Sequence, residues 1–180
     1  MFRRYACVRQ RDESDCGAAA LATLAVHHRR PIGLEAMRDL AGTDRIGTNL
    51  LGLVQAAEKL GFAAKAVKGP FEALARVPLP AIAHVKTEEG FGHFLVLHRV
   101  RKGSVVVADP ARGIQKLTRD GFCRRWTGYL LLAVPEPNAG RPSRTSAPVS
   151  PWRRFLRLLT PHTAVPSAWR RCATWPAPTA

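Results

Sequence analysis

The feature that most constrains the fold of this chain is its hydrophobic pattern, which is helical in the first part and strand-like in the second. Apolar residues recur at helical spacing up to about residue 60, and short apolar runs separated by turn residues follow. The connections between these runs are too short for crossover helices, so neighbouring strands should pair antiparallel. Helices followed by strands predict an α+β domain, with N-terminal helices packed on a mainly antiparallel sheet.

The first half of the domain contains three predicted helices. An Ala-rich helix starts at Cys16 and reaches His28, and a second spans residues 34–41. A third helix covers residues 50–60, with Thr48 as its predicted N-cap and Gly61 as its C-terminal glycine. Each helix carries one apolar stripe, so most of its residues should belong to the core.

The second half contains the predicted strands. A helical turn over 71–75 and another over 118–126, the second capped by Thr118, interrupt them. A Gly-containing turn over 101–103 should join two of the strands into a hairpin. The predicted strands cover residues 62–67, 81–85, 94–100, 104–108, 114–117 and 129–134.

The spacing of the cysteines and the hydropathy of the chain indicate its cellular compartment. The chain of 180 residues has four cysteines without CxxC spacing, which argues against a zinc site or a disulfide framework. A reducing compartment is the simpler inference. The start of the chain lacks a secretory signal, and no uncharged apolar run approaches the roughly 18 residues of a membrane span. We therefore expect a cytoplasmic chain without a transmembrane segment, and no pattern calls for a metal or another cofactor.

Charge is unevenly distributed. The net charge is +15, and residues 141–180 supply nearly half of it through seven arginines and no acidic residue. Nucleic acid is the usual partner of such a chain, but the basic residues before this tail lack aromatic interleaving and a recognition motif. A solvated surface or proximity to anionic lipid explains them as well, so no nucleic-acid partner is expected.

Composition also divides the chain. Residues 1–135 hold the predicted domain, and residues 136–151 read as a Pro/Ser/Arg-rich linker. Residues 152–180 contain at best one short amphipathic helix, begun at Trp152, and should be poorly ordered.

A candidate nucleophile lies at the start of the first helix. Cys16 follows a polar run, so it should occupy the first helical turn, where unpaired N–H groups and the helix dipole favour a thiolate. Gly17 would leave room for another chain to approach the sulfur, and Gln10 could donate to an oxyanion beside it. The alternative is that Cys16 is a buried small hydrophobe.

The candidate base is His93. His27 and His28 lie about 15 Å or more along the first helix from Cys16. His84 and His98 lie inside strands, where histidines are more often structural, and His162 is in the tail. His93 begins a strand beside a loop, after Gly92, which would let a substrate backbone approach.

Asp109, at the end of the partner strand, is the candidate acid, although Asp before Pro is also a common turn residue. A turn centred on Arg101 would place Asp109 opposite His93, and a three-residue turn would place it diagonally on the same face. A strict two-residue Lys102-Gly103 turn would put the two side chains on opposite faces. The first two registers would let Asp109 hold one ring nitrogen and leave the other for Cys16.

Four motifs in this order closely resemble those of the C39 peptidases, the N-terminal cytosolic domains of bacteriocin-processing ABC exporters. The resemblance covers about residues 5–135. It implies a papain-like fold that cuts leader peptides after a double glycine, with Cys16, His93 and Asp109 as triad and Gln10 as oxyanion donor. The motifs are Gln10 with Asp15-Cys16-Gly17-Ala18-Ala19, then Gly92-His93-Phe94-Leu95-Val96-Leu97, Ala108-Asp109-Pro110-Ala111-Arg112-Gly113 and Trp126-Thr127-Gly128.

The resemblance also implies partners. Family members continue into membrane helices and an ATPase, whereas this sequence has no GxxxxGK[ST] loop. We therefore expect a truncated exporter or a free-standing peptidase, with a double-glycine leader peptide as substrate and a membrane ABC transporter subunit as a second partner, at the inner face of the membrane. The alternatives are a non-catalytic cargo-docking domain and, less favoured, a basic nucleic-acid-binding protein.

Overall fold

The computed structural model describes residues 5–136 of the chain. Within this range, helices come first and strands follow, as the hydrophobic periods predict. Most of the predicted linker and the short helix expected from Trp152 lie outside the described residues.

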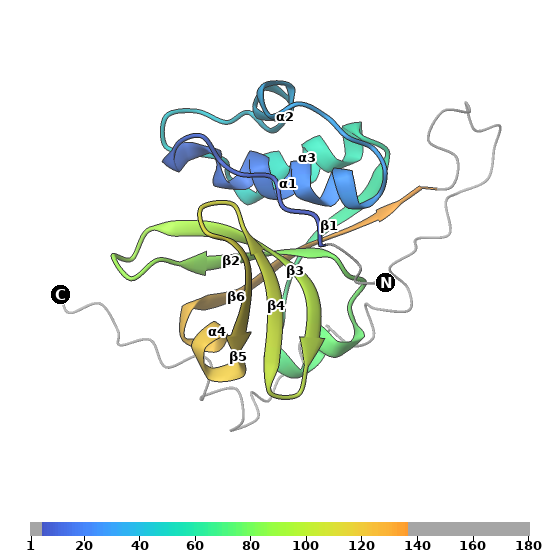
Figure 1. Ribbon diagram of the computed structural model, residues 1–180. Helices are drawn as coiled ribbons and strands as arrows, with labels where there is room; N and C mark the ends of the chain where they lie inside the picture. The colour runs from blue at the N-terminus through green and yellow to red at the C-terminus, as the bar shows by residue number, and fades with distance from the viewer. Residues whose placement is uncertain (1–4, 137–180) are drawn as a thin grey trace.

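The helices form one layer over the sheet, as Figure 1 shows. The first is Ala-rich and fully apolar for most of its length, so it is buried on nearly all sides. The other two expose one polar face each. The elements of this layer are the short 3₁₀ helix η1 (Glu13–Asp15), α1 (Cys16–His27), α2 (Leu34–Ala41) and α3 (Leu50–Lys59).

The cap of α3 differs from the prediction. The N-cap is Asn49, whose side-chain oxygen accepts a hydrogen bond from the backbone N–H of Gly52 at 2.8 Å. Thr48 is buried one residue earlier, and its hydroxyl bonds that of Thr43 at 2.6 Å. The prediction of Thr48 was wrong because Asn and Thr are both good caps, and tertiary packing decides which of two neighbours turns inward.

The six strands form one antiparallel sheet in the order β1-β6-β2-β3-β4-β5. Each strand lies within a few residues of its predicted range, and Thr118 caps α4 as expected by accepting from Gly121 N at 3.1 Å. The elements are β1 (Phe62–Lys68), the 3₁₀ helix η2 (Phe71–Arg76), β2 (Ala81–Lys86), β3 (Gly92–Arg101), β4 (Ser104–Asp109), β5 (Gly113–Thr118), α4 (Arg119–Arg125) and β6 (Trp126–Pro135).

Two hydrophobic cores hold the layers together. The first lies between the helices and one face of the sheet and includes Leu21, Leu24 and Phe94. The second lies on the opposite face, where η2 and α4 cover the strands through Phe71 and Phe122. Because both faces are covered, strands such as Ala81–Lys86 are almost continuously apolar and do not alternate strictly. This packing fixes the start of α1 against the start of β3, where the candidate site lies.

Candidate functional site

Cys16 is the first residue of α1 and is 6% exposed. The residue before it, Asp15, does not cap the helix with its side chain. Its carboxylate instead accepts from the backbone N–H groups of Arg11 and Asp12, at 3.2 and 3.4 Å, and pairs with Arg38 of α2. Asp15 is fully buried, so this network closes the polar run before Cys16 into a compact turn.

His93 and Asp109 form a buried pair. His93 Nε2 lies 2.9 Å from Asp109 Oδ1, and the exposed fractions of the two residues are 8% and 1%. The same carboxylate oxygen accepts from the backbone N–H of Ala111 at 2.8 Å. With Nε2 engaged by Asp109, Nδ1 is the ring nitrogen that remains for Cys16, which lies close enough to raise the pKa of His93.

These contacts control the charge of the pair. Burial lowers the pKa of His93, but the hydrogen bonds to Asp109 and Cys16 and the charges of both groups outweigh burial and raise this pKa to about 9. Burial raises the pKa of Asp109, while the hydrogen bonds from His93 and Ala111 N–H lower it to a net value below the usual range. The histidine is therefore an imidazolium at neutral pH, paired with a carboxylate.

The pairing at the site is the favoured diagonal one, but the turn that leads to it is the disfavoured alternative. Arg101 pairs with Ser104, so the turn is the two-residue Lys102-Gly103 type that should have put the two side chains on opposite faces. A β-bulge between Leu97 and Arg99 adds one residue to β3 and restores the parity. The histidine and the aspartate consequently meet diagonally on one face, despite the turn.

Gln10 lies beside the Asp109 turn. Its backbone N–H donates to the carbonyl of Pro110 at 3.1 Å, and the guanidinium of Arg9 donates to the carbonyl of Ala111. The Oε1 atom of Gln10 is buried without a hydrogen-bond partner among the described residues.

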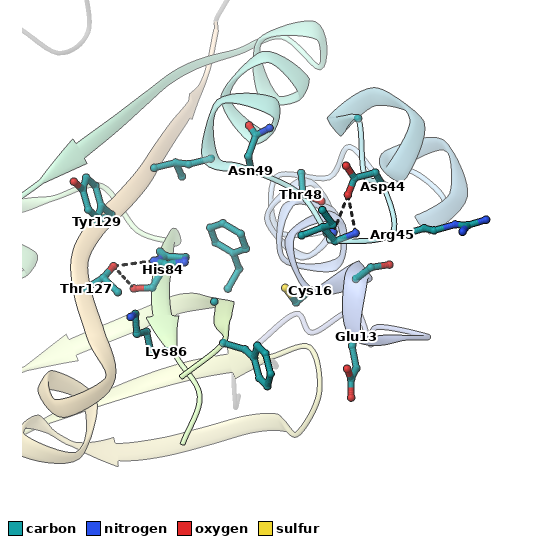
Figure 2. A pocket seen from close by; sticks show the side chains of 18 residues that line it. Glu13, Cys16, Asp44, Arg45, Thr48, Asn49, His84, Lys86, Thr127 and Tyr129 are labelled. Carbon is teal, nitrogen blue, oxygen red and sulfur yellow. Dashed lines mark hydrogen bonds between the residues drawn. The ribbon is translucent and has the colours of Figure 1, made fainter. Parts of the chain in front are cut away.

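A cleft of about 1020 Å³ opens beside Cys16. Its walls come from the start of α1, the loop from Gly42 to Leu50, the facing ends of β2 and β3, and residues Thr127 and Tyr129 of β6 (Figure 2). Exposed apolar side chains line it, including Ile46 and Phe91. An open, largely apolar trough next to a cysteine is suited to an extended peptide.

Gly17 has another role than expected, whereas Gly92 borders the cleft. A Cβ on Gly17 would lie 2.8 Å from Thr48 Cβ, so this glycine serves the packing of α1 against the loop before α3. A Cβ on Gly92 would lie 3.0 Å from Nε2 of His84. The first glycine thus makes room for the protein itself, and the second keeps space above a histidine that lines the cleft.

The remaining histidines of the described range divide by location. His98 bonds the carbonyl of Ala6 through Nε2 at 2.8 Å, and the rings of His27 and His28 meet edge to face at the far end of α1. His84, which strand position alone suggested to be structural, lies in the cleft. Its partner Thr127 comes from β6, so sequence spacing gave no signal for this contact.

The described residues hold neither a metal-binding cluster nor a helix that could cross a membrane. No group of three His, Cys, Asp or Glu side chains within residues 5–136 is arranged to hold a metal ion. Over the same range, every helix is too short or too polar to cross a bilayer.

Sequence comparisons identify relatives of the chain. The model of the Peptidase C39 family matches residues 4–138. The lactococcin-G-processing and transport ATP-binding protein LagD of Lactococcus lactis is 39% identical over 129 residues, which are 71% of this chain and 18% of LagD. The transport/processing ATP-binding protein ComA of Streptococcus pneumoniae is 37% identical over 133 residues, 72% of this chain and 18% of ComA. The chain therefore spans less than a fifth of the length of either relative.

Solved structures agree with the sequence comparisons. The peptidase domain of Streptococcus ComA, a bifunctional ABC transporter of a quorum-sensing pathway, matches with a TM-score of 0.71 and 29% identity over 74% of this chain and 100% of the other. A double-glycine-motif protease from an AMS/PCAT transporter, solved with its leader peptide, matches with a TM-score of 0.68 and 31% identity over 76% and 97%. The expected α+β fold with helices packed on an antiparallel sheet is confirmed.

Proposed function

The chain belongs to the peptidase C39 family, and on this basis we propose that it is a cysteine endopeptidase that cleaves double-glycine leader peptides from bacteriocin-type precursors. The observation that carries the proposal is the position of His93 between Asp109 and Cys16, with Cys16 itself lining the cleft. A nucleophile, a base and an orienting acid in this order are the parts that a thiol peptidase needs.

In the proposed reaction, Cys16 and His93 act as an ion pair. The Cys16 thiolate attacks the carbonyl carbon of the second glycine, and a C–S bond forms while the carbonyl oxygen becomes an oxyanion. The Gln10 amide and the backbone N–H of Cys16 donate to that oxyanion. His93 then gives its proton to the leaving amine as the C–N bond breaks, and water hydrolyses the thioester.

Asp109 acts through His93. Its carboxylate orients the ring by Nε2 and keeps the imidazolium favoured, which is the state needed to protonate the amine. Ala111 N–H in turn fixes the carboxylate.

The proposed setting follows the relatives. LagD and ComA of S. pneumoniae are named as transport and processing proteins, so we infer that cleavage by this chain is coupled to export by a membrane ABC transporter. The peptidase would then work on the cytoplasmic side, where a precursor still carries its leader.

Incubation with double-glycine precursors, including that of lactococcin G, tests the proposal. Mass spectrometry should find a single cut directly after the glycine pair, and Cys16→Ala should abolish it. Cys123→Ala is the matched control, because Cys123 lies in the other core, and it should cleave like the wild type.

Binding of these precursors without cleavage by the wild type would refute the peptidase and favour the cargo-docking alternative.

A further inference from the structure

The imidazole of His84 is fixed at the wall of the cleft by Thr127. His84 Nδ1 lies 2.9 Å from the Thr127 hydroxyl oxygen, and that hydroxyl lies 2.9 Å from the backbone carbonyl of His84 (Figure 2). The contact arises where β6 bulges: Ala83 pairs with Leu130 and Val85 with Trp126, so His84 faces an irregular stretch of three residues. The carbonyl of His84 is satisfied there by a side chain.

This arrangement determines the tautomer of the ring. A threonine hydroxyl has one proton, and a carbonyl oxygen can only accept. Since Thr127 donates to the carbonyl, its oxygen must accept from the ring, and His84 Nδ1 carries the proton. In the neutral ring, Nε2 is then an acceptor with a free lone pair.

Nε2 lies on the cleft side of the ring. It is the atom nearest to the position that a Cβ of Gly92 would take, at 3.0 Å, and it has no hydrogen-bond partner within residues 5–136. Phe94 supports the ring at a centroid distance of 5.2 Å. Burial, followed by the charges of Lys86 and His93, lowers the pKa of His84, so the ring is neutral when the cleft is occupied near neutral pH.

We propose that His84 is a substrate-binding residue whose Nε2 accepts a hydrogen bond from a backbone N–H of the peptide, within or just before the glycine pair. The inference rests on the proposed peptidase function. A glycine pair offers no side chains to recognise, so its backbone donors and acceptors must supply the contacts. Gly92, directly before His93, keeps the space above Nε2 open for such a backbone.

Peptides with single amide-to-ester replacements test the contact, because an ester oxygen cannot donate. Each backbone N–H from three residues before the cut to the second glycine is replaced in turn, and kcat/KM is measured with the wild type and with His84→Phe. Phenylalanine keeps a ring against Phe94 and removes the acceptor. At one position, the replacement should lower kcat/KM about tenfold for the wild type and less than about twofold for His84→Phe. The difference corresponds to one hydrogen bond, which only the wild type can lose.

Equal costs at every position in both proteins would overturn the inference while leaving the peptidase intact. Failure of the wild type to cleave the unmodified peptide would instead overturn the proposed function, and this inference with it.

A second pair of variants tests the tautomer without removing the ring. Thr127→Val deletes the acceptor of Nδ1–H at nearly constant volume, whereas Thr127→Ser keeps it. Nitrogen NMR shifts of His84 should show protonated Nδ1 in the wild type and in Thr127→Ser, and a shift toward protonated Nε2 in Thr127→Val. The Thr127→Val change should raise KM several-fold with little effect on kcat. An unprotonated Nδ1 in the wild type would refute the proposal.

Discussion

At the scale of single residues, the environment of His93 decides what the site can do. The pKa of an exposed histidine lies near 6.5, and here it is about 9 despite burial, because Asp109 and Cys16 both favour the charged ring. The ring is therefore a proton donor over the whole neutral range. Its pairing also stabilises the fold fully below about pH 6.5, and this contribution is lost as the pH rises through about 9.

We expect kcat/KM for leader cleavage to fall as the pH rises through about 9, because deprotonation of His93 removes the acid needed by the leaving amine. A pH–rate profile from 6 to 10 measures this limb. Asp109→Asn should move the limb to lower pH, since an amide favours the imidazolium less than a carboxylate does. If the alkaline limb stays at the same pH in Asp109→Asn, it does not report the deprotonation of His93.

Alkylation rates distinguish the thiols. We expect iodoacetamide at pH 7 to label Cys16 at least about tenfold faster than Cys7 or Cys123, since pairing with an imidazolium favours the thiolate. Burial, with Asp109 also contributing, raises the pKa of Cys7. Peptide mapping by mass spectrometry gives each rate, and His93→Ala should slow only Cys16. Equal rates for all three would argue against an activated nucleophile.

Single residues were also where sequence reasoning was strongest and weakest. Cys16, His93 and Asp109 could be chosen because helix starts, strand ends and turns have local signals. Gly17 was misread because its contact comes from Thr48, and the place of His84 in the cleft was not foreseen because Thr127 holds it there. Tertiary contacts of this kind leave no mark in the spacing of the sequence.

At the scale of elements, the turn between Gln10 and Cys16 is held by a buried carboxylate. Asp15 is fully buried and is paired with Arg38, whose side chain is 29% exposed. The network spans the segment that carries Cys16 and Gln10, the proposed nucleophile and oxyanion donor. Its geometry should therefore affect the reaction as well as the stability.

We expect Arg38→Met to lower the free energy of unfolding more than a surface substitution does, because it leaves the buried Asp15 carboxylate without its counter-ion. It should also lower kcat more than it raises KM. Urea unfolding and cleavage kinetics give the two values. Arg11→Met is the matched control, since the Arg11–Glu35 pair has side chains 67% and 75% exposed and should contribute less than about 1 kcal/mol. Equal effects of the two variants would contradict this account of Asp15.

The elements themselves were predictable, while their register was not. Hydrophobic spacing located every strand of the sheet, and Thr118 was a correct cap. The bulge near His98 had no sequence signal, yet it alone brings His93 and Asp109 to one face after a two-residue turn. A bulge depends on packing across several strands, which no local pattern records.

At the scale of the whole molecule, the described residues form a closed unit in which they pack against one another. Both cores are built from residues before Pro135, and Glu136 N–H bonds the carbonyl of Gly61 at 3.0 Å. The boundary predicted near residue 135 agrees with this closure but stays a prediction.

We expect a chain ending at residue 136 to keep its melting temperature within about 2 °C and its cleavage rate within about twofold, because changes away from packed features rarely exceed about 0.5 kcal/mol. Differential scanning calorimetry and the cleavage assay measure both. Heparin or anionic vesicles should bind the shortened chain more weakly, since it lacks seven arginines. A large drop in melting temperature would place part of the fold in the tail.

The position of β6 in the sheet determines when the fold can be completed during translation. This strand is the last to be made, yet it lies between β1 and β2, and it supplies the threonine that anchors His84. While the ribosome is still translating the region before Trp126, β1 and β2 have no common neighbour, and the trough beside the sulfur lacks one wall. The cleft beside Cys16 is therefore complete only after β6 has been made and has paired with both strands.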